Sequence, residues 1–154
     1  MLQESTNYPT VAQRKAVAKT LGDLISHGKS RVSPNDEKFF FYIASHVLGL
    51  KEMEIIDAIK NMNNGFLNFI SIGQMNKTYQ IAFRNIMYQL ITNERTPSYT
   101  ETKDFDTILS NISNQYELPI TYDTFKQSKY LNKGEMYSSP EYKFRPWSMP
   151  WDLY

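Results

Sequence analysis

Apolar residues recur at every third or fourth position through most of the chain, which is the spacing of amphipathic helices. The first stripe consists of Val17, Leu21, Leu24 and Ile25. It predicts a helix that starts after Pro9 and ends at Gly28, because proline favours the start of a helix and glycine favours its end.

A second helix start is indicated by Ser33-Pro34-Asn35-Asp36-Glu37. A serine hydroxyl suits the N-cap, and proline suits the first helical position, where no N–H is needed. The two acids face the positive end of the helix dipole. The predicted helix runs through residues 39–48 and is apolar nearly all round, so we expect it at the centre of the core.

The next two segments are also predicted from their apolar spacing. Residues 51–62 form a helix in which we expect Met53, Ile56 and Ile59 to point inward. After a break at residues 63–65, the apolar stretch Phe66–Gly73 is interpreted as a short helix or turn on the core.

The clearest stripe follows residue 74 and consists of Tyr79, Ala82, Phe83, Ile86, Met87, Leu90 and Ile91. Two more helices are predicted over Thr100–Tyr116 and Tyr122–Leu131, the last with Tyr122, Phe125 and Lys129 on one face. Because few segments alternate with the period of two that a sheet needs, the sequence predicts an all-α bundle of about six helices.

The bundle is expected to be a single domain over residues 1–131. Its core is predicted to form around Phe40, Phe41, Ala44, Ile86, Leu90, Ile108 and Ile112. These residues come from the two halves of the bundle, and each half alone would leave an apolar face uncovered, so the halves are expected to cover each other.

Residues 132–154 differ from the rest in composition. Prolines at three positions exclude a continuous helix there, while large aromatic residues are dense. The last four of these are Phe144, Trp147, Trp151 and Tyr154. Disordered tails are usually poor in aromatic residues, so this tail is expected to bind a surface. Two interpretations stay open: it wraps its own domain as an extended strap, or these four residues bind a partner.

Composition narrows the classes of function. The 154 residues carry 17 Lys and Arg against 16 Asp and Glu, so no surplus of positive charge favours nucleic-acid binding. With no Cys and two His, thiolate chemistry and a His-rich metal centre are excluded. No targeting segment is seen, and no apolar stretch reaches the ~20 residues that span a bilayer. We therefore expect a cytoplasmic protein that does not insert into membranes.

Two parts of the chain also resemble each other in sequence. At an offset of 66 residues, Val17 aligns with Phe83 and Leu21 with Met87; past a longer loop the offset becomes 68, and Ala44 aligns with Ile112. The pattern predicts two similar units, about residues 11–63 and 77–131, each with three helices.

The first unit contains three features in order. Residues 24–29 end a helix with His27-Gly28-Lys29, and the acidic helix start at residues 32–37 follows. A hydrophobic helix then ends with Leu48-Gly49-Leu50. This pattern resembles the TerB-like (tellurite-resistance) helical family, over about residues 11–131. The resemblance implies a helical scaffold or sensor in stress or defence systems, with an acidic surface linked to divalent cations.

The chain departs from that family where the cation would bind. His27 and Asn93-Glu94 stand where the family has Asp-Gly. The acids that remain as weak metal-ligand candidates are Asp36, Glu37, Glu101 and Asp104. All four are equally explained as partners of a helix N-terminus, so no metal or cofactor is expected.

No catalytic constellation is visible. His46 follows Ser45 directly, and neighbours on a helix do not face each other, so we interpret His46 as a core or boundary residue. We interpret the carboxylates of the next helix as part of a solvated helix face; they are Glu52, Glu54 and Asp57. No glycine-rich phosphate loop is present.

The sequence thus favours a non-catalytic interaction or sensor module that binds another protein. The alternatives are an enzyme that uses only carboxylates, and an accessory protein of a phage or mobile element that acts on another protein. The oligomeric state stays open.

Overall fold

The computed structural model describes residues 8–63, 65–93, 95–112 and 121–126. Within these ranges the chain forms seven α-helices, one π-helical turn and no strand, which confirms the all-α prediction. In chain order they are α2 (Val11–Ser26), α3 (Pro34–Tyr42), η1 (Ile43–Val47), α4 (Glu52–Asn61), α5 (Phe66–Gly73), α6 (Lys77–Ile91), α7 (Tyr99–Ile112) and α8 (Tyr122–Lys126).

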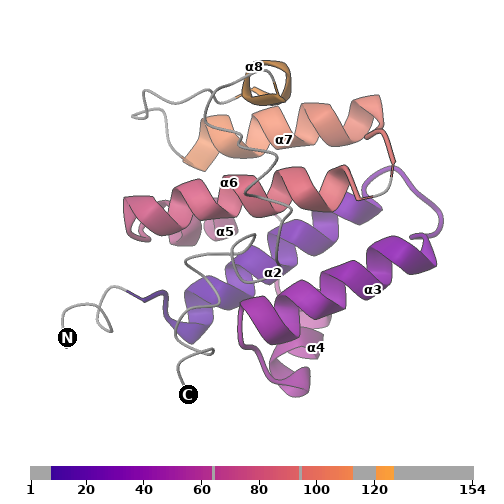
Figure 1. The fold of residues 1–154 in the computed structure, drawn as a ribbon. Coiled ribbons are helices and arrows are strands. Elements are labelled where there is room, and N and C mark those ends of the chain that lie inside the picture. Colours follow the sequence, from indigo (N-terminus) through magenta and orange to yellow (C-terminus); the bar gives the residue numbers. More distant parts are fainter. Residues whose placement is uncertain (1–7, 64, 94, 113–120, 127–154) are drawn as a thin grey trace.

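Helix α2 lies at the centre of the bundle and packs against α3, α4, α5, α6 and α7 (Figure 1). The predicted stripe of α2 is buried throughout, and so is that of α6 apart from the half-buried Tyr79. Helix α7 lies along α6, and α8 contributes the fully buried Phe125. The core therefore follows α2 and α6, both of which bury an apolar face along their whole length.

The helix starts are fixed by local hydrogen bonds. Thr10 and Gln13 form a capping box at α2, in which each side chain accepts from the other residue's backbone N–H. Ser33 caps α3 by accepting from the N–H of Asp36 at 3.2 Å, with Pro34 at the first helical position, as predicted. Gly28 follows α2 with a positive φ of 74°, which favours glycine and ends the helix.

The prediction that the helix over residues 39–48 occupies the centre of the core is wrong. It consists of α3 and the π-helical turn η1, and its outer face leaves Phe41 and Tyr42 exposed at 43% and 39%. Phe41 is therefore not a core residue. Only one side of this helix contacts α2 and α6, because it lies at the edge of the bundle. His46 is exposed and packs beside the Tyr42 ring, 5.2 Å between centroids, rather than in the core.

The inward face predicted for α4 is also wrong. Met53, Ile56 and Ile59 are exposed, whereas Ile55 and Ala58 are buried. Residues 51–62 carry two apolar stripes at helical spacing, and only one can face α2. The stripe with Ala58 is the buried one, since a small side chain lets the two helix axes approach closely.

Over the described residues, the remaining helices agree with the prediction. Phe66–Gly73 is a helix, and Gly73 lets it lie against α7: a Cβ added there would be 3.1 Å from the carbonyl oxygen of Ile112. The predicted extensions to residues 116 and 131 lie outside the described residues, as does the tail from 132 to 154.

Candidate functional site

The loops after α2 and α6 lead into two helix starts that are built alike. Ser33 accepts a hydrogen bond from the N–H of Asp36, and Ser98 accepts one from the N–H of Glu101, both at 3.2 Å. Glu101 also accepts from the N–H of Ser98 at 2.9 Å, which completes a capping box. Each loop thus fixes one carboxylate at the third position of the following helix.

These two carboxylates meet in a buried ion-pair cluster made of Lys29, Asp36, Arg95 and Glu101. Arg95 donates to both oxygens of Glu101 at 2.6 Å and to Asp36 Oδ2 at 2.9 Å. Lys29 Nζ lies 3.0 Å from Glu101 Oε2 and 4.0 Å from Asp36 Oδ2. The side chain of Glu101 is 0% exposed and that of Asp36 is 3% exposed, so Lys29 and Arg95 neutralise charges that solvent does not reach.

The cluster changes how its members ionise. Burial alone raises the pKa of Glu101, but hydrogen bonds from Arg95, the Ser98 backbone and Lys29 outweigh it and hold this pKa at about 2. The hydrogen bonds that Arg95 donates to Glu101 raise the pKa of the Arg95 guanidinium above its ordinary value. The ion pairs of Glu101 with Arg95 and Lys29 depend on its carboxylate being ionised.

The structure brings two of the four predicted metal-ligand candidates together and separates the others. Asp36 and Glu101 share the cluster, whereas Glu37 is exposed beside a groove between α2, α3 and α4. Asp104 pairs with His27 instead. Among the described residues, no three His, Asp or Glu side chains lie close enough together to hold a metal ion. The space beside Asp36 and Glu101 is taken by the protein's own cations.

Sequence reasoning missed both cations of the cluster. Lys29 and Arg95 are 66 positions apart, which is the offset that aligns α2 with α6. Extending the internal alignment through the loops would have paired them. The available signal was a pair of cations at matching positions, each ahead of a capped acidic helix start.

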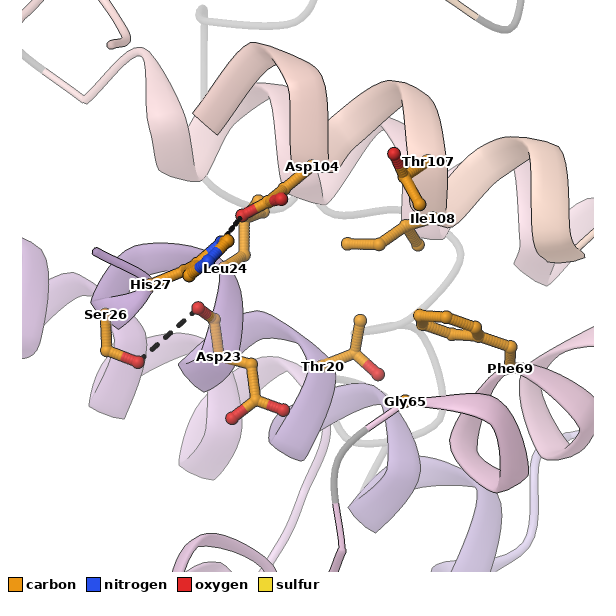
Figure 2. Close-up of a pocket in the computed structure, with 10 residues that line it drawn as sticks. All are labelled: Thr20, Asp23, Leu24, Ser26, His27, Gly65, Phe69, Asp104, Thr107 and Ile108. Atoms are coloured by element: carbon orange, nitrogen blue, oxygen red, sulfur yellow. Dashed lines mark hydrogen bonds and ion pairs between the residues drawn. The ribbon is translucent and has the colours of Figure 1, made fainter. Parts of the chain in front are cut away.

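A second candidate site includes residues from the last turn of α2. A cavity of about 310 Å³ opens between α2, α5 and α7 (Figure 2). At one end His27 Nδ1 lies 2.6 Å from Asp104 Oδ2, and Asp23 lies on the rim. Burial raises the pKa of Asp23, although Lys19 at 3.3 Å opposes this shift.

The carboxylates considered on α4 have structural roles. Glu54 accepts from the N–H of Lys51 at 2.7 Å and so caps the helix. Asp57 accepts from Asn61 and pairs with Lys15, and these contacts lower its pKa. Glu52 is exposed. The partner-binding candidates Phe144, Trp147, Trp151 and Tyr154 lie outside the described residues.

No family model matches the chain, and neither a curated protein nor a solved structure does so. Across the ranges that the structure describes, no helix has both the length and the apolar character needed to cross a bilayer.

Proposed function

We propose that the chain is a non-catalytic interaction module that binds another protein. The observation that carries this proposal is the outer face of α5, where Phe66, Leu67 and Ile70 are exposed at 66%, 68% and 44%. The helix is held on α2 and α7, so this apolar face is presented on a fixed support. Apolar residues grouped on one surface are typical of sites that bind proteins.

The proposal includes the TerB-like relationship and the internal repeat. The internal repeat is supported by buried positions that recur at an offset of 66 along α2 and α6, such as Arg14 with Gln80 and Val17 with Phe83. For α3 and α7 the burial pattern favours an offset of 65 rather than 68. With this offset, three buried positions of α3 and η1 align with buried positions of α7: Asp36 with Glu101, Phe40 with Phe105, and Ile43 with Ile108.

The ion-pair cluster supports a scaffold without a metal. Lys29 and Arg95 already supply the positive charge that a divalent cation would bring to Asp36 and Glu101, and they use both oxygens of Glu101. A cation at this place would have to displace an ammonium and a guanidinium group from two buried carboxylates. The cluster therefore joins the two loops while the exposed apolar face is left to a partner.

The alternative of a carboxylate enzyme rests on Asp23, whose raised pKa and place beside a cavity fit a general acid. A hydrolase screen with the Asp23→Asn variant separates the two: activity that this variant loses would favour the enzyme. The interaction module predicts no such activity.

The proposal is tested by crosslinking the full chain to its neighbours in the native host. A double variant, Phe66→Ser with Leu67→Ser, removes the apolar face of α5, and Tyr99→Ser serves as the matched control because Tyr99 is 78% exposed on another helix. We expect the same partner to be crosslinked to the wild type and the control, and to be lost from the double variant. An unchanged set of crosslinked proteins, with all three chains folded by circular dichroism, would contradict the proposal.

A second arm truncates the chain after Leu131. Loss of the partner here, with the α5 face intact, would assign the recognition to the aromatic tail instead of α5.

A further inference from the structure

The polar groups that line the cavity between α2, α5 and α7 are mainly hydrogen-bond acceptors. The hydroxyl of Thr20 already donates to the carbonyl of Ala16 at 2.9 Å, and that of Ser26 to Gly22 at 2.8 Å. Both oxygens are left with lone pairs only. Asp23 and Asp104 are acceptors when ionised, and the end of α2 adds the negative pole of its dipole.

The walls of the cavity are apolar. Leu24, Phe69 and Ile108 line it, and Figure 2 shows Phe69 and Ile108 pointing into the open space while Thr107 turns its hydroxyl away. At about 310 Å³, the cavity is at the lower end of the ~300–1,000 Å³ typical of small-molecule sites. It has room for a compact ligand of about one ring.

Asp104 has capacity for a further donor. Its Oδ2 contacts His27, and within the described residues its Oδ1 accepts no hydrogen bond. An ionised carboxylate offers about four lone-pair positions, so one donor does not exhaust it.

We propose that this cavity binds a compact organic cation, with an ammonium group on Asp104 and an apolar ring between Phe69 and Ile108. Acceptors outnumber donors around the lining, so a ligand rich in N–H groups is complementary to it. Phe69 adds an aromatic face that can contact the cation or its ring. This site is separate from the exposed face of α5, and it concerns a small molecule rather than a protein partner.

The test uses three ligands of similar size: 2-phenylethylamine, its neutral analogue 2-phenylethanol, and the anion 3-phenylpropanoate. Each is titrated into the ¹⁵N-labelled full chain at about pH 8. We expect saturable shifts from the amine alone, at amides of the last turn of α2 and the first half of α7. Absence of saturation, or equal binding of the alcohol or the anion, would overturn the proposal.

A variant locates the charge that is recognised. Asp104→Asn keeps the shape of the side chain and should weaken amine binding roughly tenfold, the value of one charge-assisted hydrogen bond. Glu52→Gln, an exposed acid on α4, is the matched control and should bind as the wild type does. Equal affinity in both variants would refute the role of Asp104. The comparison of amine with alcohol needs no variant, so it remains decisive if Asp104→Asn does not fold.

Discussion

Glu101 has the lowest exposure of any charged side chain that the structure describes, and its charge persists because Arg95 and Lys29 contact it. A buried carboxylate without such partners would be protonated or would destabilise the fold. Replacing Glu101 therefore leaves two cations facing Asp36 alone. At the scale of single residues, this is where the fold is most sensitive to a change of charge.

The first prediction concerns pH. The pKa of Glu101 is lowered from 4.5 to about 2, so its contribution to stability is full above about pH 4.5 and is lost as the pH falls towards 2. We expect Glu101→Gln to unfold more easily than the wild type at pH 7, by about 3 kcal/mol at most. The difference in free energy of unfolding should shrink across this acid range.

Urea denaturation of both chains at a series of pH values measures this difference. A difference that stays constant from pH 7 to pH 2 would mean that ionised Glu101 contributes nothing. Asp57→Asn is the control, since Asp57 pairs with Lys15 where solvent screens both charges, so its loss should change the stability little.

At the scale of the elements, α4 offers the sharpest comparison. Ile55 is 4% exposed and Met53 is 75% exposed, two positions apart on one helix. We expect Ile55→Ala to cost about 2–5 kcal/mol through lost burial and a cavity, and Met53→Ala to cost less than about 0.5 kcal/mol. Thermal denaturation should separate the two variants by several degrees. If Met53→Ala were the more damaging change, the rotation of α4 described here would be incorrect.

Helix starts and apolar stripes were predictable from the sequence because they depend on neighbours within one turn. Ser33 and Pro34 mark the start of α3 through a local hydrogen bond and a fixed φ. The rotation of α4 was not predictable, since two apolar stripes compete and the packing against α2 selects one. Contacts between distant loops, such as Arg95 with Asp36, also depend on the assembled bundle.

At the scale of the whole molecule, the tail from residue 132 provides a prediction that rests on the sequence alone. Burying one large aromatic side chain stabilises a protein by roughly 1.5–3 kcal/mol, and prolines reduce the entropy lost on ordering. If the tail binds its own domain, removing residues 140–154 should lower the melting temperature by several degrees, at ~2–4 °C per kcal/mol. An unchanged melting temperature together with an unchanged set of partners would show that the tail binds neither its own domain nor another protein.

The central claim is that Lys29 and Arg95 neutralise the buried acids, so that the chain needs no metal at the place where the two loops meet. Calorimetric titration of the full chain with Ca²⁺ and with Mg²⁺, after removal of bound metal, tests it most directly. The account predicts no heat of binding at low micromolar concentrations of either ion, since the oxygens of Asp36 and Glu101 already contact the protein's own cations. Tight binding that is lost in Asp36→Ala or Glu101→Ala would contradict it and assign a cation to this cluster.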